Sequence, residues 1–119
     1  MGATRVTVKL VNMENKQSYE ALFLVDTGAT DLLAPGDELE KIGLERVGKE
    51  TDELADGREI SFDYGVVRIE MLGNITAGRV IFGPPAVEPL LGVLVLEAFG
   101  IVVDPKTHSL RKLPALLLK

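Results

Sequence analysis

Short apolar segments separated by turn-forming residues run the length of this chain, and they restrict it to a mostly β architecture. In TRVTVKLV, the apolar Val6, Val8 and Leu10 alternate with polar residues, which is the two-residue period of a half-buried strand. The polar NMENKQ that follows predicts a turn. Residues 21–25, ALFLV, are apolar at every position, as expected for a strand that is covered on both faces. The chain is therefore expected to begin with two strands.

Only two segments have the features of helices, and both are short. After TGATDLLAPG, which we expect to be a loop, DELEKIGL places Leu39 and Ile42 on one face and ends at Gly43. VLVLEAFG predicts a second helix, closed by Gly100. Strands and helices do not alternate regularly, so the pattern does not favour a nucleotide-binding parallel sheet.

Turn signals predict two hairpins. Asp56 and Gly57 lie between extended segments and suit the positive backbone angles of a tight turn, so a projecting hairpin is expected there. Beyond it, the apolar positions change parity between Val66, the last of the first set, and Val67, which predicts a bulge or kink near Gly65. GIVVDPKTHSLRKL predicts the second hairpin, with DPKT as its turn.

Composition and charge exclude several classes of function. The 119 residues suit a single domain spanning residues 1–119. A net charge of -5 argues against nucleic acid as a partner. The chain has no cysteine and a single histidine, His108, which excludes thiolate catalysis, a serine triad and a histidine metal cluster. The glycines form neither GxGxxG nor a Walker loop, so we expect no nucleotide cofactor. Together with the missing cysteines and histidines, this leads us to expect no metal and no cofactor of any kind.

The sequence also predicts where the protein is found. MGATRVTVKL alternates polar and apolar residues and lacks the basic segment and apolar block of a signal peptide. The apolar run LLGVLVL is far shorter than the roughly 20 residues that a membrane helix needs. We therefore expect a cytoplasmic protein with no membrane partner.

An acidic residue directly after the apolar strand is the main candidate for chemistry. Asp26 follows ALFLV and precedes Thr27 and Gly28. Two carboxylates that share one proton can hydrolyse a peptide bond, one acting as base and the other as acid. Thr27 can hydrogen-bond to fix the loop, and Gly28 allows backbone or substrate to approach closely. The alternative is that Asp26 merely caps a strand.

The segment LVDTGA resembles the active-site signature of the retropepsin-like aspartic proteases, in particular the small archaeal and bacterial members. LLGVLVLEAFG is similar to the later signature of that family, an apolar pair and glycine followed by a short helix. LADGREISF resembles in its placement the hairpin flap that covers the substrate. Two features depart from the family: the flap has one glycine and charged neighbours, and Leu94 stands where many relatives carry a polar residue.

The resemblance implies a mostly β, retropepsin-like closed acid-protease barrel with one or two short helices. Because the chain contains one DTG and the mechanism needs two aspartates, it also implies a homodimer with Asp26 of each copy at the two-fold axis. Residues 5–10 and the terminal PALLLK are the candidate interface strands. The implied catalytic residues are Asp26, Thr27 and Gly28; the implied substrate-binding residues are Ala29, Asp31, Ala55, Asp56 and Gly57.

The sequence thus predicts an aspartic endopeptidase that acts on a peptide or protein substrate at acidic to mildly acidic pH. A dimer of the same fold that binds peptides or serves in assembly without turnover is the alternative, because fold alone does not establish catalysis. A β structural protein with a chance DTGA is a third interpretation. Asp31 could equally be a solvated loop residue, and Asp56 and Gly57 an ordinary hairpin tip.

Overall fold

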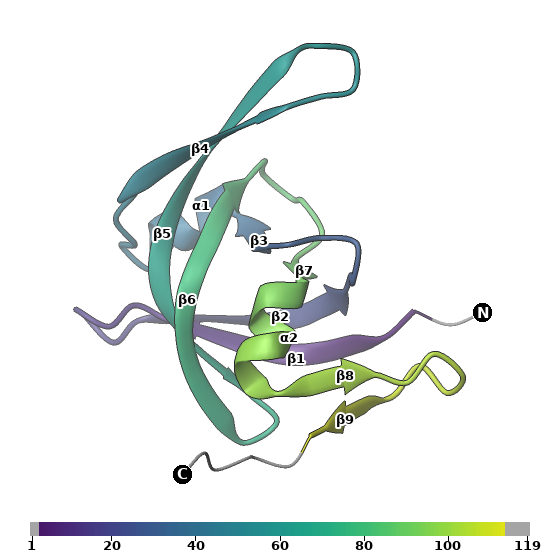
Figure 1. Cartoon of the computed structure of the whole chain (residues 1–119). Coiled ribbons are helices and arrows are strands. Elements are labelled where there is room, and N and C mark those ends of the chain that lie inside the picture. Colours follow the sequence, from purple (N-terminus) through teal and green to yellow (C-terminus); the bar gives the residue numbers. More distant parts are fainter. Residues whose placement is uncertain (1–2, 114–119) are drawn as a thin grey trace, which may run out of the picture.

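The computed structural model describes residues 3–113, and in this range the chain is mostly β with two short helices, as predicted (Figure 1). The elements follow in the order β1 Arg5–Val11, β2 Ser18–Val25, β3 Leu32–Pro35, α1 Gly36–Lys41, β4 Gly48–Glu53, β5 Glu59–Met71, β6 Asn74–Gly83, β7 Leu90–Leu91, α2 Val93–Phe99, β8 Ile101–Val103 and β9 Leu110–Lys112.

Strand pairing closes most of the main sheet into a ring. The seven-stranded sheet has the order β1-β2-β7-β3-β6-β5-β4, and β1 also pairs with β5. Of the seven described strands of this sheet, β4 lies outside the ring and pairs with β5. The inner side of the ring holds the hydrophobic core; its largest fully buried side chains are Phe23, Leu10, Leu32, Leu39, Ile69, Leu91, Val8, Val67 and Val80.

The first two strands form an antiparallel hairpin joined by the predicted turn. The alternation predicted for β1 is confirmed, since Val6, Val8 and Leu10 are all buried. The expectation that ALFLV is covered on both faces is wrong at Leu22, which is 59% exposed. Strand β2 alternates as β1 does, so Phe23 faces the core and Leu22 points away from it.

The strand β5 is long, and it serves two structures in succession. From Glu59 to Tyr64 it pairs with β4 in the projecting hairpin, and from Tyr64 to Met71 it pairs with β6 in the ring. Both registers run without interruption, so the bulge, one of the two forms (bulge or kink) predicted near Gly65, is wrong. The apolar parity changes because the core lies on one face of β5 only within the ring. Gly65 lies close to the segment before β4: an added Cβ would lie 2.7 Å from the backbone oxygen of Glu45, so there is no room for a side chain at this position.

One strand lies in a segment that we expected to be a loop. Residues Leu32–Pro35 form β3, which runs parallel to β6 and touches β7 through a single antiparallel pair. Leu32 and Ala34 are fully buried in the core. The strand is too short to show a period of its own, and its pairing partners are distant in sequence.

Both helices and the second hairpin are confirmed. Gly43 after α1 and Gly100 after α2 have positive φ angles of 71° and 67°, the left-handed conformation that glycine adopts at helix ends. Strands β8 and β9 pair around the DPKT turn. The predicted interface segment PALLLK lies outside the described residues. Within residues 3–113, neither helix is long and apolar enough to cross a membrane.

Candidate active site

Asp26 lies directly after β2, where the chain turns toward β3. Its backbone N–H donates to the carbonyl oxygen of Leu91 (3.0 Å), which continues the parallel pairing of β2 with β7. Its side-chain Oδ1 accepts a hydrogen bond from the N–H of Gly28 (2.9 Å), and its carbonyl oxygen accepts one from Ala29 (3.1 Å). The carboxylate is therefore held in a tight turn at the end of a strand that lies inside the sheet.

Residues 26–31, here called the Asp26 loop, are also held by the start of α2. The N–H of Val93 donates to the carbonyl of Ala29 (2.9 Å), and the N–H of Leu94 donates to that of Thr30 (3.1 Å). These bonds use amides in the first turn of the helix, which have no partner within it. The start of α2 therefore fixes the Asp26 loop through backbone contacts.

The tip of the Asp26 loop is open to its surroundings. Asp26 and Ala29 are half-buried, whereas Thr27 and Gly28 are exposed. In the described part of this single chain, the turn is closed by the amides of Gly28 and Ala29 and not by the Thr27 hydroxyl. Hydrogen bonds to β7 and within the turn thus hold Asp26, while the next two residues, Thr27 and Gly28, are exposed.

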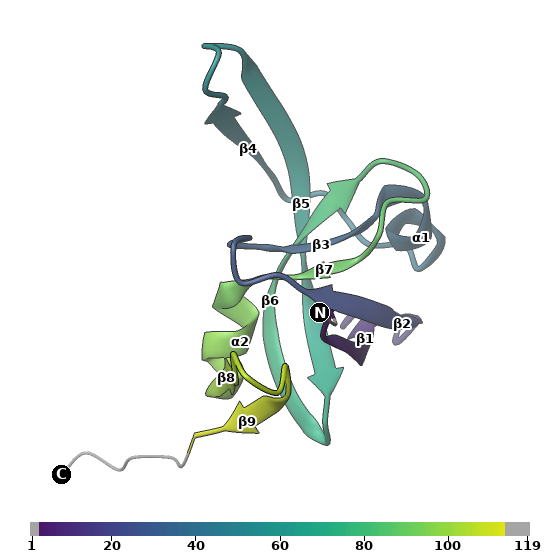
Figure 2. The same cartoon turned by 90° about the vertical axis from the view of Figure 1, so that its right-hand side faces the viewer.

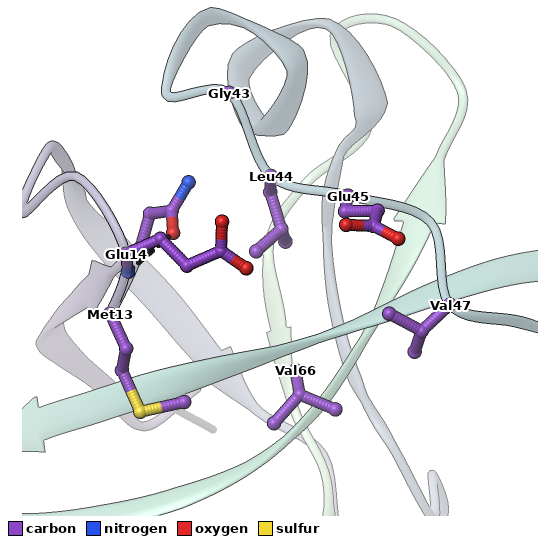
Figure 3. Close-up of a pocket in the computed structure, with 8 residues that line it drawn as sticks. Met13, Glu14, Gly43, Leu44, Glu45, Val47 and Val66 are labelled. Atoms are coloured by element: carbon purple, nitrogen blue, oxygen red, sulfur yellow. Dashed lines mark hydrogen bonds between the residues drawn. The ribbon is translucent and has the colours of Figure 1, made fainter.

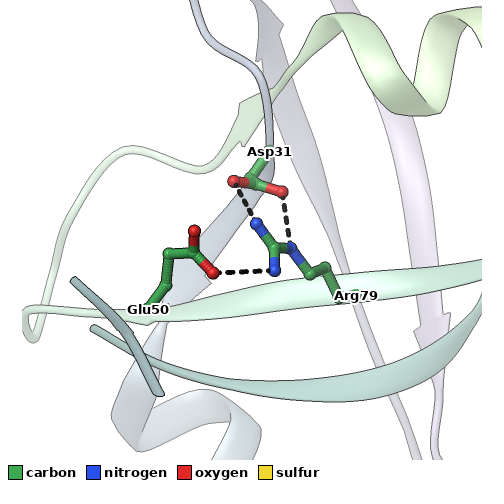
Figure 4. A network of polar contacts seen from close by, with 3 residues as sticks. All are labelled: Asp31, Glu50 and Arg79. Atoms are coloured by element: carbon green, nitrogen blue, oxygen red, sulfur yellow. Dashed lines mark hydrogen bonds and ion pairs between the residues drawn. The ribbon is translucent and has the colours of Figure 1, made fainter. Parts of the chain in front are cut away.

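Asp31, at the end of this loop, is tied to an arginine that the sequence analysis did not single out (Figure 4). Arg79 of β6 donates from Nε to Asp31 Oδ1 (2.9 Å) and from a terminal nitrogen to Asp31 Oδ2 (3.1 Å). The other terminal nitrogen donates to Glu50 of β4 (3.1 Å). Asp31 is therefore not a free solvated residue, and both of its carboxylate oxygens already have a partner.

The other three candidate substrate residues lie at the tip of the β4–β5 hairpin. Gly57 has a φ of 87° and donates to the carbonyl of Leu54 (2.9 Å), so the predicted tight turn is present. Asp56 pairs with Arg58 (2.6 Å), and Ala55 is exposed. This tip is far from the ring but projects on the same side as the Asp26 loop (Figures 1 and 2). The structure brings Asp26, Thr27, Gly28 and Ala29 together in one turn, and leaves the tip as a separate group.

Two hollows help to define what surrounds the site. One, of about 150 Å³, lies between β6 and α2, with Asp31, Arg79 and the half-exposed Leu94 in its wall. The other, of about 200 Å³, is lined by Asn12, Met13, Glu14, Gly43, Leu44, Glu45, Val47 and Val66 (Figure 3). None of the candidate site residues lines the second hollow, so it is separate from the Asp26 loop.

The donor groups suited to metals are scattered. Among residues 3–113, no three side chains of histidine, aspartate or glutamate lie together in an arrangement that could hold a metal ion. Asp31, in the Asp26 loop, and Glu50 are paired instead with Arg79.

The comparisons with known proteins add no further assignment. No family model and no curated protein matches the chain.

Proposed function

We propose that this protein is an aspartic endopeptidase of the retropepsin-like kind, active as a homodimer. The observation that carries the proposal is the setting of Asp26. Its carboxylate is half-buried at the end of β2, and one oxygen is fixed by the Gly28 amide at 2.9 Å. The loop that carries it is bonded to β7 on one side and to α2 on the other. A catalytic carboxylate needs such a rigid support.

The second carboxylate comes from the partner copy. The exposed Thr27 and Gly28 leave the face of the loop beside Asp26 uncovered in the single chain. A two-fold axis there brings the two Asp26 side chains together, because a two-fold interface places identical residues opposite each other. Two carboxylates at such short range share a single proton.

The shared proton lets the pair act as base and acid in the same step. The ionised Asp26 takes a proton from a water molecule, and the water oxygen attacks the carbonyl carbon of the peptide. The protonated Asp26 gives its proton to the carbonyl oxygen. In the second step, the Asp26 that took the proton from water gives it to the leaving nitrogen as the C–N bond breaks. The other Asp26 takes a proton from a hydroxyl of the diol as the carbonyl re-forms, so the dyad returns to its starting state. The cycle uses water and the two side chains alone.

The β4–β5 hairpin supplies the cover over the bound peptide. Ala55, Asp56 and Gly57 are the residues of the tip that meet the substrate, and Ala29 lines the groove beside the dyad. Since the hairpin projects on the side of the Asp26 loop, a peptide held between the two would lie next to the carboxylates (Figures 1 and 2).

The test is a peptide-library digest with wild type and Asp26→Asn across pH 3 to 8. We expect cleavage by wild type, strongest at acidic to mildly acidic pH, and a loss of at least about a hundredfold in the variant, since positioned proton transfer contributes about 10²–10⁴-fold. Asp37→Asn, an identical change at an exposed position in α1, is the matched control and should keep full activity.

Folding and assembly of each variant are checked by circular dichroism and sedimentation. Full activity in folded Asp26→Asn would contradict the proposal. Binding of library peptides without cleavage by wild type would favour the noncatalytic peptide-binding module in its place.

A further inference from the structure

The ion pairs around Arg79 join the Asp26 loop to β4. Among the described residues, these two segments have no other polar link between side chains. Asp31 belongs to the Asp26 loop and lies 48 residues before Arg79 in the chain. Glu50 belongs to β4, the strand outside the ring. Figure 4 shows the guanidinium between the two carboxylates. We call these three residues the Arg79 bridge.

The two halves of the Arg79 bridge differ in strength. Asp31 makes a two-point contact with the guanidinium, at 2.9 and 3.1 Å, and its side chain is 21% exposed. Glu50 makes a single contact at 3.1 Å and is 39% exposed. Bidentate pairs of arginine with carboxylate are the stronger and more directional kind. The link from Arg79 to Glu50 is therefore the one that opens first.

The contact between Arg79 and Glu50, the weaker half of the bridge, lies where the β4–β5 hairpin leaves the ring. Pairing of β5 with β6 ends at Tyr64, so beyond that residue β4 and β5 form a two-stranded ribbon. Every residue from 51 to 60 is exposed. Isolated two-stranded ribbons are only marginally stable in water. A contact between Glu50 and the ring therefore influences where the whole ribbon points.

The local packing places Arg79 for this role. Its guanidinium lies 4.9 Å from the centre of the Tyr64 ring, an attractive cation–π arrangement. The Tyr64 ring in turn lies across β4 at Gly48, where an added Cβ would come within 2.4 Å of the ring. Hydrogen bonding to Asp31 raises the pKa of Arg79 further above its ordinary value, although partial burial opposes this. Arg79 therefore keeps its positive charge throughout the ordinary pH range.

We infer that Arg79 is a positioning residue that couples the β4–β5 hairpin to the Asp26 loop, with the Glu50 contact as its releasable half. When the contact is made, the hairpin is held relative to the loop that carries Asp26. When it breaks, the ribbon is free to move while Asp31 stays paired. This inference rests on the proposed function only for its consequence in catalysis; the coupling itself is a property of the chain.

Hydrogen–deuterium exchange tests the coupling without any need for activity. In Glu50→Gln we expect the amides of β4 to exchange about two- to fivefold faster, the range that corresponds to a partly exposed ion pair, with the Asp26 loop and β6 unchanged. Arg79→Lys keeps the charge but loses the two-point geometry, so both β4 and the segment around Asp31 should exchange faster. Asp52→Asn, on the same strand and without an ion pair within residues 3–113, is the matched control and should match wild type.

Kinetics test the consequence for catalysis. Glu50→Gln should raise KM about two- to fivefold with kcat nearly unchanged, because the hairpin holds substrate and Asp26 is untouched. The inference is overturned if Glu50→Gln and Asp52→Asn give the same exchange in β4. If wild type shows no proteolysis at all, the proposed function fails, and the exchange comparison still decides whether Arg79 couples the two segments.

Discussion

Gly92, the N-cap of α2, lies directly against the end of the Asp26 loop. An added Cβ would lie 2.5 Å from the backbone oxygen of Asp31 and 2.6 Å from that of Thr30. Both neighbours are backbone atoms, so neither can swing aside as a side chain would. The absence of a side chain at this position is therefore a condition for the hydrogen bonds that hold the loop.

We predict that Gly92→Ala destabilises the protein by about 1–3 kcal/mol, the usual cost of overpacking a tight contact. The displaced loop should also lose the bond from Leu94 to Thr30, so the proposed proteolytic activity should fall with stability. Chemical denaturation measures the first effect. Gly78→Ala is the control, because its Cβ would meet only the end of Ile69 at 3.5 Å; equal stability of the two variants would contradict the argument.

At the same scale, the sequence showed Asp26 but not its surroundings. An apolar strand that ends in DTGA has a local signature, and the structure places Asp26, Gly28 and Ala29 in one turn as expected. Arg79 has no such signature, since it is a single arginine in the strand segment GRVIF. Its role depends on Asp31, 48 residues away, and on Glu50, 29 residues away. Only the folded chain brings these charges together.

The β8–β9 hairpin shows how a single side chain stabilises a whole element. Asp104 Oδ1 accepts hydrogen bonds from the backbone N–H groups of Lys106 (2.8 Å) and Thr107 (3.3 Å). These bonds favour the ionised carboxylate and lower the pKa of Asp104 below its ordinary value of 3.8. A carboxyl group whose pKa is lower in the folded state stabilises that state above its unfolded pKa, and the contribution disappears as pH falls through the folded pKa.

We therefore predict that Asp104→Asn is less stable than wild type near pH 6, and that the difference shrinks as pH falls below about 3.8, where the carboxyl group of the unfolded chain becomes protonated, and through the lower pKa of the folded state. Asparagine retains an acceptor oxygen but does not titrate, so the comparison isolates the charge. Denaturation midpoints measured from pH 6 to pH 2 provide the test. A difference that stays constant over this range would show that Asp104 does not act through its ionised form.

Elements with a period of their own were predictable, and those defined by distant partners were not. The alternation of β1 and the glycines after α1 and α2 are local features, and each prediction made from them is confirmed. The strand β3 has four residues and pairs with β6 and β7, far along the chain, so its own sequence predicts a loop. The parity change in β5 is real, but it marks the point where the strand leaves the ring and not a bulge.

The whole molecule carries one DTG, which makes assembly part of the proposed chemistry. One chain closes the ring of strands by itself, with β4 outside the ring, and it carries a single Asp26 loop. A lone carboxylate cannot serve as base and acid in the same step. The proposed activity therefore belongs to a pair of chains, and it should vary with their concentration and with the composition of the pair.

Mixing experiments test this dependence directly. If chains exchange freely, equimolar Asp26→Asn should reduce the activity per wild-type chain to about half, because half of the wild-type chains then pair with an inactive partner in a two-fold dimer. Equimolar Asp37→Asn should leave that activity unchanged, since this change lies in α1 and removes no dyad member. Activity per chain should also fall on dilution below the dissociation constant of the dimer. Activity that responds neither to the Asp26→Asn chain nor to dilution would show that one chain suffices, and the two-chain dyad would then be wrong even if Asp26 is essential.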